Sequence, residues 1–179
     1  MSIKKYVLMN QNTKVLNFGF DEELNIITEI FDIYNIDYAP YKIKNEYNIN
    51  SNIDRLTINS WFSGRGIPMH RDNINEVTEQ FNISTAKELI NKHFALGLSD
   101  QYWVKPIDLQ IEWEEINYFD NNYDAINFTN ATFGENAASS IKGLTNETSD
   151  KFKTPNNTTD GQLRKVWLKI DNKNYLLNR

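Results

Sequence analysis

The sequence predicts an α+β fold with a short N-terminal hairpin, a central three-helix unit and a C-terminal β-hairpin. Three observations predict this class. Short runs of strand-forming residues, separated by polar turns, occur near both ends of the chain, as in β-hairpins. Between about residues 50 and 96, apolar residues recur at the spacing of helices. The stretch 134–160 is rich in small and polar residues, which is typical of a loop.

These patterns divide the chain of 179 residues into three parts. Residues 1–133 are expected to form a small α+β domain, and residues 134–160 a polar linker. Residues 161–179 are expected to form a β-hairpin that packs on the domain. A chain of this length can bury a core of its own.

The N-terminal hairpin is predicted from the runs KKYVLMN and TKVLNFGF, which the polar turn NQNT joins. The next segment, DEELNIITEIFDIYN, spaces Leu24, Ile27, Ile30 and Phe31 as on a helix. Its content of isoleucine, phenylalanine and tyrosine suits a strand equally well, so both interpretations stay open. The following IDYAPYKI is interpreted as a connection that a proline marks.

The central unit is predicted from three consecutive helical patterns. The first, SNIDRLTINSWFSGRG, ends at Gly64 and Gly66, and Pro68 follows as a stop signal. The second is RDNINEVTEQFN, and the third is STAKELINKHF. The third helix begins at an N-cap, either Ser84 or, by the spacing of a capping box with Glu88, Thr85.

Composition excludes several classes of function. The net charge of −5 and the isoelectric point of about 5.1 disfavour a general nucleic-acid coat, although not a local basic patch. The chain has no cysteine and only two histidines, so we expect no thiolate or histidine-rich metal site and no thiol nucleophile. No run approaches the ~20 apolar residues of a membrane span. We therefore expect a cytoplasmic protein without membrane contact. The richness in Asn, Ile, Lys and Tyr is typical of AT-rich codons, which indicates a low-GC bacterium or its phage as the source.

An aromatic and acidic segment follows the helical unit. Tyr102, Trp103 and Trp113 could anchor a protein interface, since aromatic residues are enriched there. The same residues could instead be core aromatics beside exposed acids, and the sequence leaves both interpretations open.

Three carboxylates in this segment could form an acid/base pair: Glu112, Glu114 and Glu115. On a strand, Glu112 and Glu114 would share a face, and Glu115 would point away. Because no histidine, cysteine or glycine-rich site lies nearby in the sequence, we interpret them as a solvated acidic rim.

Two basic groups could contact an anionic partner. Arg55, Arg65, His70 and Arg71 surround a glycine-containing turn and could contact phosphates, although a solvated helix face explains them as well. The last hairpin is basic against an acidic body, which favours an anionic or acidic partner. Its candidate partner-binding residues are Arg164, Lys165, Trp167, Lys169 and Lys173, with Arg179 adding charge.

Three segments carry a family resemblance: WFSGRGIPMHRDNINEV, ALGLSDQYWVKP and PNNTTDGQLRKVWLKIDNKNYLL. Together they resemble the N-terminal part of the HipA-like serine/threonine kinase proteins of low-GC bacteria. In those proteins a W-x-x-x-R-x-I-P-x-x-R-D segment, G-L-S-D-Q-Y-W and a D-G-x-x-x-K-x-W hairpin occur in this order. The resemblance implies a small α+β domain, followed by the glycine-containing loop and the first strands of a kinase N-lobe.

The resemblance also implies which residues match the nucleotide loop. Gly161 matches the loop glycine and Lys165 the lysine that follows it, and a serine or threonine that can be phosphorylated falls near Thr154. Asn178 stands where the family has a lysine that pairs with ATP phosphates, and an asparagine supplies no charge for that role. In the family the catalytic loop and the C-lobe follow beyond the position of Arg179. We therefore expect no kinase activity and no cofactor.

Three hypotheses of function follow. In the first, the chain is a non-catalytic interaction module of a phage or mobile element, which binds a host RNA-guided nuclease or its DNA as an anti-CRISPR inhibitor does. In the second, the chain is a small regulatory subunit of a split HipA-like toxin–antitoxin kinase, and the hairpin edge docks on the kinase core. In the third, the helical unit around Arg55 to Arg71 binds DNA directly.

Overall fold

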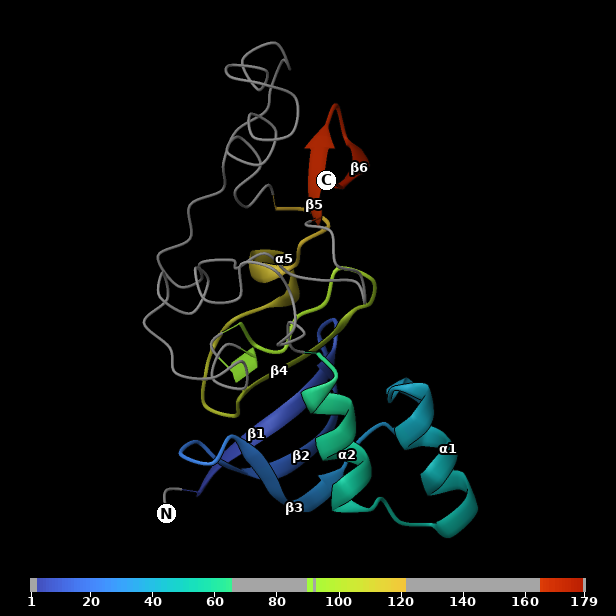
Figure 1. Cartoon of the computed structure of the whole chain (residues 1–179). Helices are drawn as coiled ribbons and strands as arrows, with labels where there is room; N and C mark the ends of the chain where they lie inside the picture. Colours follow the sequence, from blue (N-terminus) through green and yellow to red (C-terminus); the bar gives the residue numbers. More distant parts are fainter. Residues whose placement is uncertain (1–2, 66–89, 92, 122–164, 179) are drawn as a thin grey trace.

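A four-stranded antiparallel sheet is the centre of the fold (Figure 1). Its strands are β1 (Ile3–Asn10), β2 (Thr13–Asp21), β3 (Ile26–Ile33) and β4 (Tyr102–Pro106), in the order β3-β2-β1-β4. The structure is a computed structural model, and it describes residues 3–65, 90, 91, 93–121 and 165–178. Sheet and helices together confirm the predicted α+β class.

The predicted N-terminal hairpin is confirmed. Asn10 pairs with Thr13, so that Gln11 and Asn12 form the turn, and Gln11 has a φ of 49°. The segment that the sequence left open between helix and strand is the strand β3, paired with β2 through Ile27 opposite Phe20. A strand is favoured over a helix here because β2 supplies a pairing partner, and this pairing buries Ile27 in the core.

One face of the sheet is covered by a short 3₁₀-helix, η1 (Ile36–Tyr38), and the helices α1 (Tyr41–Asn50) and α2 (Arg55–Ser63). The interpretation of IDYAPYKI as a connection is wrong beyond Pro40. Helix α1 begins directly after this proline, because the fixed φ of proline suits the start of a helix and needs no amide hydrogen. Asp54 caps α2 by accepting a hydrogen bond from the Leu56 N–H at 2.9 Å.

Helix α2 confirms the first helix of the predicted central unit. Residues 66–89 lie outside the described residues, so the second helix and the caps at Ser84 and Thr85 stay predictions. Ile90 and Asn91 are helical, in agreement with the third, but His93 and Phe94 at its predicted end lie in a turn, where Phe94 has a φ of 53°. The apolar residues of α1 and α2 pack with those of the sheet in the first core cluster, whose fully buried members include Phe18, Phe20, Ile43, Ile58 and Phe62.

The other face of the sheet is covered at its β1–β4 end by the chain on either side of β4, between residues 94 and 119. This part holds the short helix α5 (Trp113–Ile116). Its apolar residues meet Val7 and Met9 of β1 in a second core cluster, which includes Trp103, Ile111, Trp113, Ile116 and Tyr118. The strand β1 therefore contributes to both cores, with Leu8 in the first and Val7 in the second.

The C-terminal hairpin consists of β5 (Lys165–Ile170) and β6 (Lys173–Asn178), as the sequence predicts. Asp171 and Asn172 connect the strands with φ angles of 48° and 59°, the left-handed conformation that a two-residue type I′ turn requires. In Figure 1 this hairpin lies at the opposite end of the molecule from β3 and α2. The linker 134–160 lies outside the described residues, so the domain division stays a prediction.

Candidate functional site

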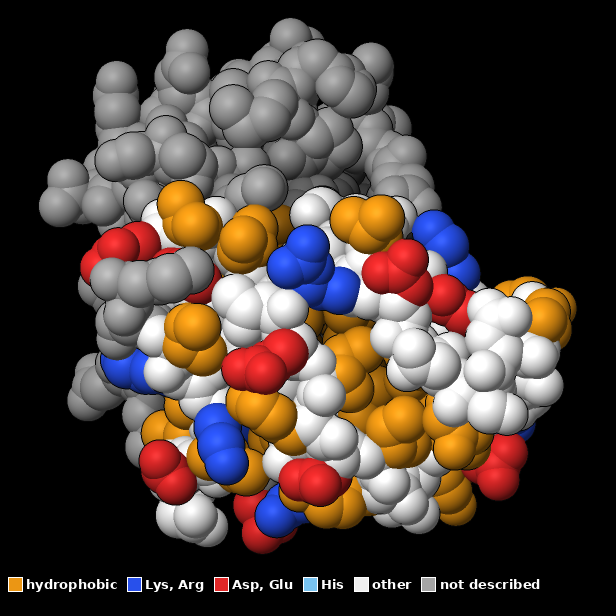
Figure 2. All heavy atoms as spheres, turned by 90° about the horizontal axis from the view of Figure 1, so that it is seen from below, with side chains coloured by type: hydrophobic (Ala, Val, Ile, Leu, Met, Phe, Trp, Pro, Cys, Tyr) orange, Lys and Arg blue, Asp and Glu red, His pale blue; other side chains and the backbone are white. Residues whose placement is uncertain are grey.

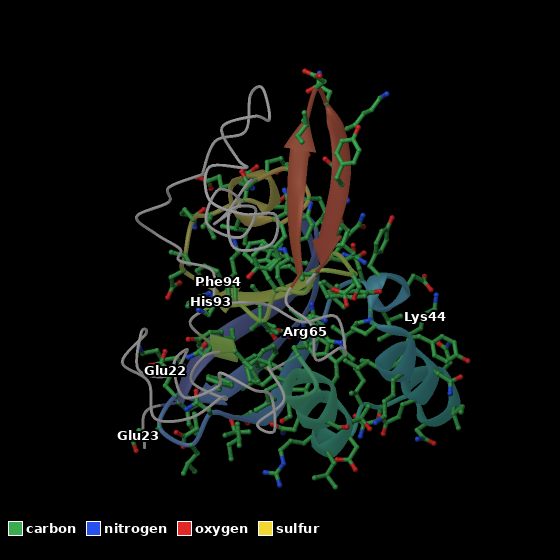
Figure 3. All side chains as sticks on the ribbon, turned by 45° about the horizontal axis from the view of Figure 1, so that its top comes forward. Glu22, Glu23, Lys44, Arg65, His93 and Phe94 are labelled. Atoms are coloured by element: carbon green, nitrogen blue, oxygen red, sulfur yellow. The ribbon has the colours of Figure 1, made fainter. Side chains whose placement is uncertain are left out.

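Arg65 joins two segments that the sequence singles out as motifs. It lies just after α2, four residues beyond Trp61 (Figure 3). Its guanidinium forms two bonds of 2.8 Å with the carboxylate of Asp100. Nη2 also donates to the Tyr102 carbonyl at 2.9 Å, and Nε donates to the Ala95 carbonyl. The guanidinium lies over the Trp61 ring, 4.9 Å from its centroid. We call this group, Trp61, Arg65, Asp100 and Tyr102, the arginine clamp.

The arginine clamp corrects the prediction that Arg65 belongs to a phosphate or partner patch. The Arg65 side chain is only 8 % exposed, and its nitrogens donate to acceptors within the chain. A bidentate arginine–carboxylate pair fixes geometry, so the clamp positions the loop before β4 against the end of α2. Arg55 is exposed, whereas His70 and Arg71 lie outside the described residues.

Gly97 lets this loop approach the clamp. A Cβ atom at Gly97 would lie 2.7 Å from Arg65 Nη2 and 3.4 Å from Asp100 Oδ1. Contacts under 3.0 Å force a neighbour to move, and Arg65 is held by its four hydrogen bonds. The glycine of the G-L-S-D-Q-Y-W segment is therefore explained by close packing.

Two of the predicted interface aromatics are core residues. Trp103 is fully buried and donates its indole N–H to the Gln11 carbonyl at 2.7 Å. Trp113 is 5 % exposed, and its backbone N–H donates to Asn12 Oδ1 at 2.9 Å. The prediction that they anchor a partner is wrong, because the turn of the first hairpin and the second core cluster already cover them.

Tyr102, the third predicted interface aromatic, is half-buried. Its hydroxyl donates to the Ala39 carbonyl at 3.3 Å, and its ring meets Trp61 edge to face. Burial, and then the Asp100 charge, raise the pKa of the Tyr102 hydroxyl. Its carbonyl accepts from Arg65, so Tyr102 links the clamp to the first core cluster.

The three carboxylates of this segment support local structure. They lie at α5 and not on a strand, so the expected shared face of Glu112 and Glu114 does not form. Glu115 Oε2 accepts from the Glu112 N–H at 2.9 Å, and Glu114 Oε2 accepts from Asn12 Nδ2 at 2.8 Å. All three residues are exposed, which agrees with an acidic rim.

Other ionisable groups of the described residues also hold structure together. Burial, and then the hydrogen bond to Glu22 at 2.8 Å, raise the pKa of Tyr6. An ion pair with Lys4 lowers the pKa of Glu22. Burial lowers the pKa of Lys105, whose ammonium donates to the Ile111 carbonyl at 2.9 Å. In the described part of the chain, no group of three histidine, cysteine or acidic side chains could hold a metal ion.

The hairpin β5–β6 carries the remaining predicted partner-binding residues. Lys173 is exposed, as are Tyr175 and Leu176 in the same strand. Lys165, Trp167, Lys169 and Asn178 lie in the two strands, and the structure describes their backbone pairing. Gly161 and Arg164 lie outside the described residues.

The sequence did not indicate a further surface on α1 and α2. Among the described residues, the three most exposed large apolar side chains are Tyr41 at 82 %, Ile49 at 72 % and Leu56 at 69 %. Figure 2 views the face of the molecule that includes the lower ends of these helices, where apolar side chains form a continuous area among charged ones. The available signal was Tyr41, Asn45 and Ile49 at spacings of four on a helix, which required α1 to be recognised first.

No known protein family, curated protein or solved structure matches this chain. Among the described helices, none combines the length and the apolar character needed to cross a membrane.

Proposed function

We propose that this chain is a non-catalytic interaction module, which binds a protein partner by adding its hairpin β5–β6 to a sheet of that partner. The observation that carries this proposal is the sheet topology. In the part of the chain that the structure describes, β5 and β6 pair only with each other, and no other described strand lies on their outer edges. An isolated two-stranded hairpin is marginally stable, and a third strand from a partner would stabilise it.

The chemistry of the described residues supports a binding role over a catalytic one. Three of the side chains that suggested chemistry or phosphate contact, those of Arg65, Glu114 and Glu115, make structural hydrogen bonds. Because Arg65 is buried in the arginine clamp, it does not contribute a cation to DNA binding by the helical unit. A protein partner is therefore favoured over duplex DNA.

The first candidate partner is an RNA-guided nuclease, which the chain would inhibit as a product of a phage or mobile element. Exposed Lys173 near the hairpin turn would meet an acidic patch of the nuclease or the phosphates of its DNA. The test mixes the purified chain with a nuclease–guide RNA complex from a low-GC bacterium and measures DNA cleavage without ATP. We expect a stable complex and loss of cleavage, and full cleavage at an excess of the chain would contradict the proposal.

Strand addition has its own test in the same assay. Leu176→Pro removes a backbone N–H from β6 and should abolish binding, because proline cannot donate to a strand ladder. Leu176→Thr is the matched control, since it changes the same side chain but keeps a strand-forming residue and its N–H. Equal binding by the two variants would show that the backbone of β6 is not the binding element.

The second candidate is a kinase core, favoured by the place of the hairpin in the HipA-like resemblance. In this alternative the hairpin completes the N-lobe sheet of a separate chain and activates or silences it. Co-expression with a HipA-like kinase core that lacks this N-terminal part, followed by gel filtration and phosphate transfer from labelled ATP, tests it. Co-elution with a changed rate of phosphorylation would support this partner, and separate elution would contradict it.

A further inference from the structure

The two strands of the C-terminal hairpin differ in the residues whose backbone groups point outward. Ile170 and Lys173 close the two-residue turn, and residues that close such a turn exchange hydrogen bonds with each other. In an antiparallel ladder every second pair is bonded in this way, and the pairs between them turn their N–H and C=O groups outward. The register therefore assigns outward groups in β6 to Asn174, Leu176 and Asn178, and in β5 to Lys165, Trp167 and Lys169.

The outer edge of β5 has a composition that protects against strand addition. Lysine occupies two of its three outward positions, Lys165 and Lys169. Lysine on an edge strand hinders pairing with a further strand, because its charge resists the loss of water that pairing requires. The three outward positions of β6 are asparagine, leucine and asparagine. The two edges of the hairpin are therefore unequal, and β6 is the one suited to accept a strand.

The two outer edges of the four-stranded sheet are occupied by contacts within the chain. At β3, Asn59 Oδ1 accepts from the Ile27 N–H at 2.8 Å, and Asn59 Nδ2 donates to the Ile27 carbonyl at 2.7 Å. Register shifts also interrupt β3, as β-bulges do in protected edge strands. At β4, the Val104 N–H donates to the Phe94 carbonyl at 2.7 Å. Among the described residues, no corresponding contact occupies the outer edge of β6.

The middle of β6 is accessible from both faces of the hairpin. Neighbouring residues of a strand point to opposite faces, and Tyr175 is 47 % exposed while Leu176 is 42 % exposed. The outward N–H and C=O groups recur at every second residue, about 6.6 Å apart along the strand. Another extended backbone repeats donors and acceptors at the same interval, whereas phosphates only accept and would leave the C=O groups without donors. A β-strand therefore matches this edge better than a nucleic acid does.

We infer that β6 is the strand of the hairpin that pairs with the partner, and that it binds the open edge strand of a sheet in a protein through the backbone of Asn174, Leu176 and Asn178. This inference rests on the proposed function and names its binding edge. The three residues span about 13 Å, so the edge of the partner must be at least about five residues long. Exposed Lys173 beside them fits an acidic side chain near the end of the partner strand.

The test measures hydrogen exchange at single backbone amides of the full chain, alone and bound to a nuclease–guide RNA complex from a low-GC bacterium. Amides without a hydrogen-bond partner exchange fast, and pairing with a strand protects them. On binding, the three outward amides of β6 should exchange at least about tenfold more slowly. The three outward amides of β5 should keep their exchange rates within about twofold.

Proline substitutions give a second measurement on the same two edges. Leu176→Pro removes an outward N–H from β6, and Trp167→Pro removes the one opposite from β5, while the hydrogen bonds between the strands stay. Leu176→Thr and Trp167→Thr are the matched controls, because they change the same side chains and keep the N–H. In biolayer interferometry, Leu176→Pro should bind at least about tenfold more weakly than Leu176→Thr, and the two variants at Trp167 should bind equally.

The outcomes separate this inference from the proposed function. If the outward amides of β5 are protected instead, and only Trp167→Pro loses binding, the hairpin proposal stands and the assignment to β6 is overturned. If sedimentation shows a dimer of the chain alone in which the outward amides of β6 are already protected, this edge pairs with a second copy and the inference is also overturned. If the complex does not bind the chain, or binds it without protecting the hairpin, both proposals fail.

Discussion

Replacing Asp100 with alanine should destabilise the fold by leaving the Arg65 guanidinium without its carboxylate. Removing one partner of a buried ion pair costs about 3–5 kcal/mol. Here the Asp100 side chain is 34 % exposed, and Arg65 keeps the carbonyls of Ala95 and Tyr102 as acceptors. We therefore expect a smaller loss, about 2–3 kcal/mol in the free energy of unfolding. For a chain of this size the melting temperature should fall by about 4–12 °C.

A double-mutant cycle isolates the pair from the other contacts of Asp100, which also accepts a hydrogen bond from the Tyr102 N–H. Urea unfolding is measured for Asp100→Ala, Arg65→Met and the double variant. We expect a coupling energy of about 1–2 kcal/mol, since the two side chains share two hydrogen bonds. Losses that add to within about 0.5 kcal/mol would refute the clamp as a coupled unit.

Three further predictions concern the same framework. Gly97→Ala should lower the unfolding free energy by about 1–3 kcal/mol, because the new Cβ would overlap with Arg65, which its hydrogen bonds hold in place. Thermal melting checks this, and an unchanged melting temperature would show that the arginine clamp can adjust its position. Asn59→Ala should lower the unfolding free energy, measured in urea, by about 1–3 kcal/mol, because the Asn59 amide forms hydrogen bonds with both the N–H and the carbonyl of Ile27 at the edge of the sheet. Ser63→Ala, at an exposed position, is the control, and equal losses in the two variants would contradict the reasoning. Because the pKa of Tyr6 is raised in the folded state, stability should be constant up to about pH 10 and fall above it, and Tyr6→Phe should weaken this fall; unfolding measured from pH 8 to 12 tests the sign.

The elements that the sequence predicted are those with strong local signals. The first hairpin has two strand-like runs joined by a polar turn, and α2 has a capping aspartate and an apolar face. Helix α1 lacks such a face, because Ile43 is its buried residue and asparagines interrupt the pattern. Its position depends on tertiary packing between η1, α2 and the sheet, which a periodic pattern does not record.

The candidate site was harder to predict, because a side chain's exposure is set by distant partners. Arg65 and Asp100 are 35 residues apart, and their spacing gives no sign of contact. The available signal was that Arg65 and Asp100 each lie in a segment that the sequence singles out, WFSGRG and GLSDQYW. Trp103 shows the same limit, since its burial depends on Gln11 in a turn 92 residues away.

The central position of β1 also has a consequence for how the chain folds. Its neighbour β2 follows after a two-residue turn, whereas its other neighbour, β4, begins only at Tyr102, far along the chain. The first hairpin can therefore form early, while a nascent chain shorter than about residue 106 leaves the second edge of β1 open, beside Val7 and Met9. Because non-local pairing slows folding, insertion of β4 is expected to be the late step.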